Sequence, residues 1–455
     1  LRTIARLDRA TSVIVLAPEP GDGPIWQPLS PDDLSPASAE VVKVAVAASA
    51  AARASEADRA RTELAATPLR LVVEVPETGC DDHDLADIIK RRLRPDESAG
   101  DTVADPTDES HLRTSNHIDV LPIDVASLQT YLAARVSQRH GLSAVYRELL
   151  DFQGCEFHTL VGGGATFGEL EDRMLNGILV GVVDRKVFSM PARTDHVAAE
   201  SKLVVLSERA GLASLSPAAD RRRVVGAASG VGVKRNARTA ETVLVLGWNH
   251  RGPRLLKTLG TQLPPESALR VVTGPGDHIV PVIGSGEGVT VDVITSETGL
   301  QSWLDDPANR PALQCDHALV LGDDQLGAAA SDAGVLLTLL KLNPGSKERE
   351  DLPKTVVAEL RQRPNRRLAR RRFADDLVVG DSLVASVLAQ YSATPDLGAV
   401  FDALIDGEDG AGFELDFLAV TYPDGHSLTF SDIQNACRDL EAIAIGYRVG
   451  GNVRL

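Results

Sequence analysis

The chain has 455 residues, a length that accommodates about two to four domains of ordinary size. Hydrophobic residues make up 43% and charged residues 24% of it, which is the composition of a globular protein and excludes wholesale disorder. The formal net charge of −17 and an aromatic content of 4% argue against nucleic acid as a partner, because an acidic surface repels phosphate and few rings are available to stack on bases.

The four cysteines lie far apart, at positions 80, 155, 315 and 437. Neither a C-x-x-C pair nor the paired spacing of a zinc site occurs in the sequence. This usage is typical of reduced thiols in a cytoplasm and gives no support to a disulfide framework.

The first part of the chain alternates short apolar, β-branched segments with longer helical ones. The predicted elements are, in chain order, strand 12–17, helix 37–66, strand 69–75, helix 83–93, strand 118–121 and helix 125–138. Continuous apolar strands with helices between them are typical of a parallel sheet whose two faces are covered by helices. We therefore expect a Rossmann-like domain over residues 1–140. The shorter helices and strands that follow predict a small α+β lobe over residues 141–210.

The second part follows a segment, residues 211–240, that is rich in Arg, Ala and Gly and is interpreted as a linker. Its predicted elements are strand 242–247, helix 251–262, strand 269–273, strand 289–294, strand 317–322, helix 331–342 and strand 356–359. With residues 376–381 and the apolar helix behind them, they predict a second Rossmann-like domain over residues 241–393. Residues 394–455 are predicted to form a second small α+β lobe.

The order of segments in the first part returns in the second. The corresponding pairs are 12–17 with 317–322, 71–74 with 356–359, 119–124 with 376–381, 142–151 with 397–406, and 166–170 with 429–433. Each half then continues into a strand centred on Gly181 or Gly446. We therefore predict an α/β fold that is a tandem duplication, with two Rossmann-like parallel-sheet domains that are each followed by a small α+β lobe.

The two halves are unequal at their starts. The first begins at the counterpart of the fourth strand of the second, so the first Rossmann-like domain is predicted to lack its N-terminal half. Because the sequence opens at Leu1 without a methionine, we expect that another part of the protein precedes it.

A series of short segments, in this order along the chain, carries a family resemblance. They are 142–156, 166–183, 244–249, 356–360, 364–366, 376–385 and 441–448. These segments resemble the RCK (regulator of potassium conductance) domains of the CASTOR/POLLUX family of ion channels. The excess of Arg over Lys favours a bacterial member.

The resemblance implies that the chain is the cytoplasmic regulatory portion, or gating ring, of a ligand-controlled cation channel. In such a channel four subunits form the ring, and a transmembrane pore precedes the tandem RCK domains. The implied partners are further copies of the chain and its own pore. The full-length protein is then a membrane protein, and this portion lies on its cytoplasmic side.

Gly247, Asn249 and Gly252 occupy the turn between the first strand and the first helix of the second domain, where dinucleotide-binding folds carry three glycines. Asn249 stands at the second glycine position, where its side chain would crowd a pyrophosphate. A ribose-binding acid is also missing from the end of the next strand, at Thr273. The turn is interpreted either as a degenerate nucleotide loop or as a strand–helix turn maintained for packing, and the packing interpretation is favoured.

Asp323 and Asp324 follow a strand of the second domain, at the edge of an open α/β sheet where ligands bind. They are interpreted as candidate calcium ligands, with a solvated turn as the alternative. A second acidic segment, 406–410, lacks EF-hand spacing and is interpreted as a solvated turn.

The sequence contains no H-E-x-x-H motif, no G-x-S-x-G elbow and no phosphate-binding G-x-x-x-x-G-K-[ST] loop. We therefore predict that the chain is not an enzyme. Two alternatives stay open beside the channel. One is a soluble RCK-type regulatory subunit of an ion transporter, and the other is an NAD-dependent oxidoreductase, which rests on the fold class alone and is disfavoured by Asn249.

Overall fold

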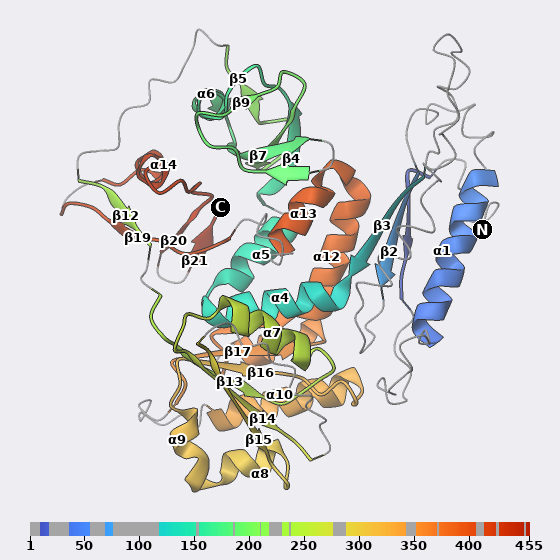
Figure 1. Ribbon diagram of the computed structural model, residues 1–455, viewed down its shortest axis with the longest axis vertical. Helices are drawn as coiled ribbons and strands as arrows, with labels where there is room; N and C mark the ends of the chain where they lie inside the picture. The colour runs from blue at the N-terminus through green and yellow to red at the C-terminus, as the bar shows by residue number, and fades with distance from the viewer. Residues whose placement is uncertain are drawn as a thin grey trace. The chain divides into compact units, whose positions relative to one another are not determined.

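A computed structural model describes most of the chain (Figure 1). The described residues are 10–17, 36–54, 69–75, 118–151, 154–184, 187–209, 211–217, 230–235, 238–275, 288–342, 352–370, 373–405, 414–424, 427–449 and 452–455. The predicted helix at 83–93 and the acidic segment at 406–410 lie outside them. The chain divides into two compact units, residues 1–126 with 388–395 and residues 127–387 with 396–455.

The first unit contains a parallel sheet with the strand order β1-β2-β3, against which helix α1 packs. The bounds are Ser12–Val15 for β1, Pro36–Ala54 for α1, Leu69–Val75 for β2 and Ile118–Asp124 for β3. On α1, Val41, Ala45 and Ala48 are buried and join a core cluster with Leu71 and Val73 of β2. Their spacing of four and three residues places them on one face of the helix, which explains why this face covers the sheet.

The first small lobe, in the second unit, is built on an antiparallel sheet with the order β4-β10-β7-β8. Its elements are α5 Leu142–Leu150, β4 Glu156–Val161, β5 Ala165–Thr166, α6 Phe167–Arg173, β6 Met174–Leu175, β7 Ile178–Asp184, β8 Val187–Ser189, β9 His196–Val197, β10 Lys202–Ser207 and β11 Ser214–Leu215. Helix α6 begins at a capping box, in which the side chains of Thr166 and Glu169 each accept a hydrogen bond from the other's backbone N–H. Phe167 and Leu170 then enter the core of the lobe beside Leu203.

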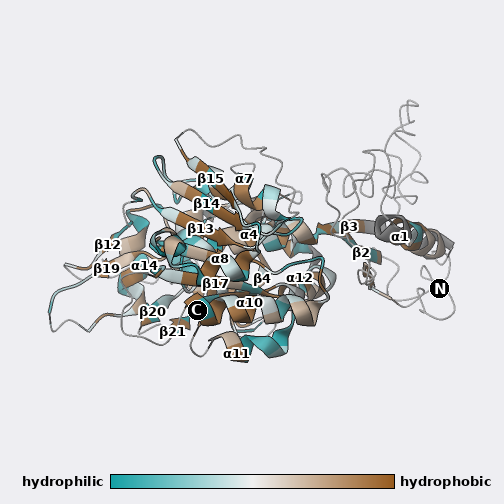
Figure 2. Cartoon of the chain, turned by 90° about the horizontal axis from the view of Figure 1, so that it is seen from below, coloured by the Kyte–Doolittle hydropathy of each residue, from teal (hydrophilic) through white to brown (hydrophobic). Residues whose placement is uncertain are grey.

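The second unit also contains a fully parallel six-stranded sheet with the order β15-β14-β13-β16-β17-β18. Its elements are β13 Thr242–Leu246, α7 Gly252–Gln262, β14 Ala268–Thr273, β15 Thr290–Thr295, α8 Leu300–Asp305, α9 Arg310–Leu313, β16 His317–Val320, α10 Ala328–Leu342, β17 Thr355–Leu360, α11 Arg366–Arg370 and β18 Asp376–Val379. Figure 2 shows hydrophobic residues along β13 and β14, and residues 243–246 of β13 are fully buried. The strand order reverses between β13 and β16, as in a doubly wound fold.

The remaining elements include two long helices and the second small lobe. They are α4 Val125–Gln138, β12 Gly232–Lys234, α12 Gly380–Ala393, α13 Gly398–Ile405, β19 Ala419–Thr421, α14 Phe430–Arg438, β20 Tyr447–Val449 and β21 Asn452–Arg454. Strand β12 comes from the segment interpreted as a linker and pairs with β19 of the second lobe. Within the described residues, no helix combines the length and the hydropathy needed to cross a bilayer.

The predicted α/β fold class is confirmed. In each half, three parallel strands adjoin one another in chain order, β1-β2-β3 in the first and β16-β17-β18 in the second. The capping box is also repeated, because Thr429 and Asp432 start α14 in the way that Thr166 and Glu169 start α6.

One strand of the predicted repeat differs. The strand expected around Gly446 begins only at Tyr447, and β20 pairs antiparallel with β21 in a two-stranded sheet. Its counterpart β7 instead lies inside the four-stranded sheet of the first lobe, with five of its seven residues buried. All three residues of β20 are exposed, so the second half lacks the apolar packing that draws β7 into a larger sheet.

Candidate functional site at the switch point of the six-stranded sheet

The loop after β13 lies where the order of the six-stranded sheet reverses, the place at which open α/β sheets bind ligands. Gly247 starts this loop with a φ of 90°, a left-handed conformation that favours glycine. A Cβ at this position would also lie 2.9 Å from the backbone oxygen of Leu321, in the segment that follows β16. Gly247 is therefore required for the close approach of two backbone segments.

Asn249, at the predicted second glycine position, is a buried bridge between three segments. Its side-chain Nδ2 donates to the backbone oxygen of Gly322 at 3.2 Å and to Oε2 of Glu359 at 3.4 Å. Its Oδ1 accepts from the backbone N–H of Arg251 at 3.1 Å. The side chain thus occupies the space in which a glycine would leave room for a phosphate, and it uses that space to join the ends of β13, β16 and β17.

Glu359 is a charged residue in an otherwise apolar buried strand, with 4% of its surface exposed. Its carboxylate forms an ion pair with the guanidinium of Arg251, which belongs to the loop after β13. Each charge offsets the desolvation of the other, so loss of either would remove a compensating charge from a buried group. This pair fixes the loop to β17.

The neighbouring carboxylates of Asp323 and Asp324 contact different partners. Oδ2 of Asp324 accepts from the backbone N–H of His250 at 2.7 Å and also contacts Nδ1 of the same residue. Oδ1 of exposed Asp323 accepts from the backbone N–H of Gln325 at 2.9 Å, within its own turn. Burial acts to raise the pKa of Asp324, but the hydrogen bonds and the charge of His250 outweigh it, and the pKa is lowered.

Within the described residues, no group of three or more His, Cys, Asp or Glu side chains converges in the manner of a metal site. Calcium at Asp323 and Asp324 stays a prediction, and it would require Asp324 to exchange His250 for the ion.

Gly252, the third predicted glycine, lies at the start of α7. A Cβ here would come within 2.6 Å of the ring of Trp248, so the glycine allows this indole to lie against the helix. The backbone N–H of His250, close to the same helix start, donates to Asp324. In a dinucleotide fold, loop amides at this place bind pyrophosphate. Here a carboxylate of the chain accepts the hydrogen bond. Both interpretations of Gly247, Asn249 and Gly252, the degenerate nucleotide loop and the favoured packing turn, stay predictions.

Several solved structures match the chain, whereas no family model and no curated protein does. The structure "GsuK channel bound to NAD" matches at 16% identity with a TM-score of 0.37, over 88% of this chain and 54% of that one. "Crystal Structure of the GsuK RCK domain" matches at 14% identity with a TM-score of 0.36, over 88% of this chain and 65% of that one. "GsuK Channel" matches at 14% identity with a TM-score of 0.35, over 88% of this chain and 54% of that one. The chain thus spans between about half and two thirds of these structures, and no function follows from likenesses of this size.

Proposed function

We propose that the chain is the regulatory, gating portion of a cation channel of the CASTOR/POLLUX type, with two RCK-like units in tandem. The resemblance of segments such as 244–249 and 376–385 supports the family, and the duplicated run of three parallel strands supports the tandem arrangement. In this role the α/β units move as rigid bodies and do not transform a substrate.

The proposal rests on the side-chain contacts that fill the switch point of the six-stranded sheet. Asn249 fills the place of a glycine, the Arg251–Glu359 ion pair fixes the loop to β17, and Asp324 accepts from a loop amide. A dehydrogenase of this fold needs those amides for its cofactor and space for the reacting carbon. A regulator needs a rigid body that transmits motion, and the network supplies the rigidity.

Helix α10 supports assembly into a ring. Leu326, just before the helix, and Leu337 and Leu340 within it are large apolar side chains with 45%, 44% and 48% of their surface exposed. Exposed Ala330 and Ala333 lie between them, and the four residues within the helix follow one another at steps of three, four and three. This spacing forms an apolar stripe of the kind along which two helices pack.

We infer that a second copy of the chain covers this stripe, which we name the α10 stripe (Leu326, Ala330, Ala333, Leu337 and Leu340). The stripe is uncharged, so two copies can approach along it despite the net charge of −17. Its small central residues and larger ends allow it to pack against a second stripe of the same sequence.

Cation flux through the full-length product of the gene tests the proposed function. The protein is reconstituted in liposomes loaded with a potassium-sensitive or calcium-sensitive dye, and the ion is added outside. Flux that exceeds that of protein-free liposomes, and that changes when the double variant Leu337→Glu/Leu340→Glu replaces the wild type, supports the proposal. Reconstituted protein that conducts neither ion contradicts it.

A further inference from the structure

A cavity of about 200 Å³ lies in the second unit at the amino ends of the strands, the end opposite to the switch point. Three segments line it: the end of α4 with the following turn, the segment just before β13, and the second small lobe. Its volume exceeds the share of a single water, about 30 Å³, and is below the 300 Å³ or more typical of sites for drug-sized molecules. The space suits a small ligand.

The wall of this cavity is basic, although the chain is acidic. Arg139, Arg238 and Arg448 line it, and Glu241 is the carboxylate among its lining residues. A guanidinium group has five N–H donors in a planar fork that matches the oxygens of phosphate or carboxylate groups. Three of them around one small cavity provide donors of the kind that bind an anion.

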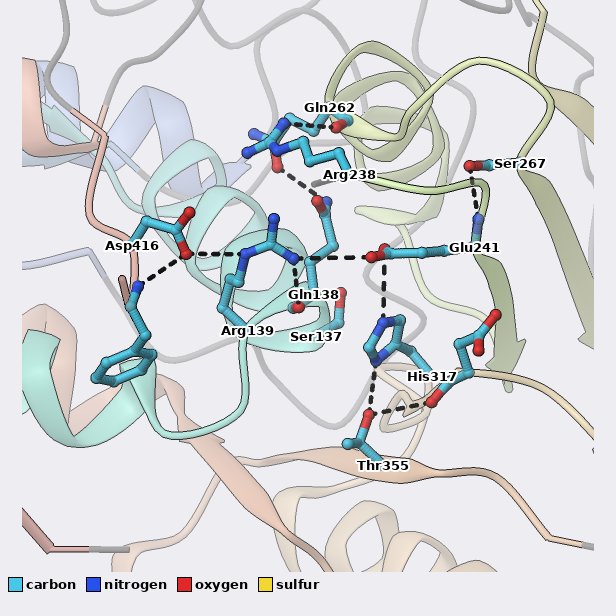
Figure 3. Close-up of polar contacts among 12 residues, drawn as sticks. Ser137, Gln138, Arg139, Arg238, Glu241, Gln262, Ser267, His317, Thr355 and Asp416 are labelled. Carbon is cyan, nitrogen blue, oxygen red and sulfur yellow. Dashed lines mark hydrogen bonds and ion pairs between the residues drawn. The ribbon is translucent and has the colours of Figure 1, made fainter. Parts of the chain in front are cut away.

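Two of the arginines are held in place by acidic side chains behind the wall. Nε of Arg139 donates to Asp416 at 3.0 Å, and one Nη lies 3.7 Å from Glu241 (Figure 3). Arg238 forms an ion pair with Glu414 and donates to the backbone oxygen of Gln262 at 3.3 Å. These contacts orient the guanidinium groups while using part of their donors, which is how a preorganised anion site is built.

Arg448 is held by a backbone carbonyl and an aromatic ring. Its Nη1 donates to the backbone oxygen of His140 at 2.6 Å, and its guanidinium lies over the ring of Phe417, 4.0 Å from the centroid. Gly141 makes room for it, since a Cβ there would lie 3.0 Å from Nη1 of Arg448. Among the residues that the structure describes, no acidic side chain lies within 4.0 Å of this guanidinium, so its charge is available to a ligand.

The carboxylate of Glu241 is directed to other partners. One oxygen lies 3.7 Å from Arg139 and the other 3.5 Å from Nε2 of His317, whose Nδ1 contacts Oγ1 of Thr355 at 2.6 Å (Figure 3). These contacts partly balance its negative charge. The cavity therefore keeps a net positive wall.

We propose that this pocket binds a small phosphate-like oxyanion, either free inorganic phosphate or the phosphate group of a phosphomonoester. The proposal is carried by the size of the cavity, its three arginines and the charge of Arg448, which forms no ion pair with any residue that the structure describes. A bound anion would join the turn after α4, the start of β13 and the second lobe. This inference does not depend on the channel function.

Calorimetric titration of the chain with inorganic phosphate and with glycerol phosphate tests the proposal, at an ionic strength held constant with sodium chloride. We expect saturable binding of phosphate. Arg448→Gln should weaken it about tenfold or more, because a charge-assisted hydrogen-bond partner is removed. Arg310→Gln, which removes an exposed arginine of α9 that does not line the cavity, is the matched control and should leave the affinity unchanged.

A variant that is expected to bind phosphate more tightly shows that a change in affinity does not result from a loss of folding. Glu241→Gln removes the negative charge from the wall and should tighten phosphate binding several-fold. Binding of glycerol phosphate with an affinity similar to that of phosphate assigns the site to phosphomonoesters as well, whereas binding of phosphate alone assigns it to the free ion. The proposal is overturned if neither compound binds saturably, or if Arg448→Gln and Arg310→Gln bind phosphate equally well.

Discussion

The carboxylate of Asp376 accepts a hydrogen bond from the backbone N–H of Gly141 at 2.9 Å. Asp376 starts β18 of the second domain, and Gly141 precedes α5 of the first small lobe. The same carboxylate also accepts from the backbone N–H and the hydroxyl of Ser143. A buried side chain of one repeat thus caps a helix of the other, and the two repeats are joined by a specific contact.

Replacement of this cap should destabilise the second unit. Asp376→Asn removes the negative charge from the N-terminus of α5 and weakens its hydrogen bonds, so we expect a loss of about 1–2 kcal/mol in the free energy of unfolding. Urea denaturation measures it. Asp292→Asn, at an exposed position of β15, serves as the control, and equal effects of the two substitutions would argue against the capping role.

The ion pair at the switch point should contribute far more than one at the surface. Glu359→Gln removes a counter-charge of the buried guanidinium of Arg251, and we expect the free energy of unfolding to fall by about 3–5 kcal/mol. The surface pair of Lys341 and Asp305, at 2.7 Å, provides the comparison. Asp305→Asn should lower the free energy of unfolding by at most about 1 kcal/mol. Urea denaturation measures both variants, and similar decreases in the free energy of unfolding for Glu359→Gln and Asp305→Asn would show that the Arg251–Glu359 pair is not effectively buried.

Asp324 should stabilise the fold in a pH-dependent way. Its folded-state pKa lies below the ordinary value of 3.8, so its contribution is fully present above that value and is lost as the pH falls through the folded-state pKa. The stability difference between the wild type and Asp324→Asn should therefore shrink between about pH 5 and about pH 3, where the Asp324 carboxylate becomes protonated. Urea denaturation at several pH values in this range measures it, and a difference that does not shrink would contradict the stabilisation of this carboxylate in the folded state.

Disruption of the α10 stripe should change the assembly state. Leu337→Glu with Leu340→Glu places like charges on both copies at the inferred interface, and we expect the oligomer to dissociate into smaller species. Light scattering after size-exclusion chromatography measures the mass. Glu297→Lys, an exposed charge change away from α10, is the control. An unchanged mass in the double variant would place the assembly surface elsewhere.

Much of the fold could be predicted from the sequence, because buried strands and helices leave strong patterns. The strand at 69–75 and the helix at 125–138 have the predicted bounds, since their apolar residues follow the periods of a buried strand and an amphipathic helix. The strand predicted around Gly446 is present but starts at Tyr447 and lies in a two-stranded sheet, because its side chains are exposed and do not pack into a larger sheet. Alignment of two halves transfers the order of elements but not the packing that holds each strand in a sheet.

The location of the switch point could be predicted from the sequence, but the contacts between its side chains could not. The positions of Gly247 and Asn249 after a strand indicated the switch point, and Asp324 was named as a candidate. The role of Glu359 was missed because its partner Asn249 lies 110 residues away in the sequence. The available signal was a single acidic residue inside the apolar strand β17, which indicates a buried ion pair. The anion pocket left no local pattern, since Arg139, Arg238 and Arg448 come from distant segments.

Titration with NADH tests most directly whether the switch point of the six-stranded sheet is already filled by the chain's own side chains. The chain is mixed with NADH, and both the heat of binding and the nicotinamide absorbance are followed. With Asn249, Asp324 and Glu359 in place, we expect no saturable binding in the micromolar range and no change in absorbance. Saturable micromolar binding with turnover of the nicotinamide would show that the switch point is open and that the chain is an oxidoreductase.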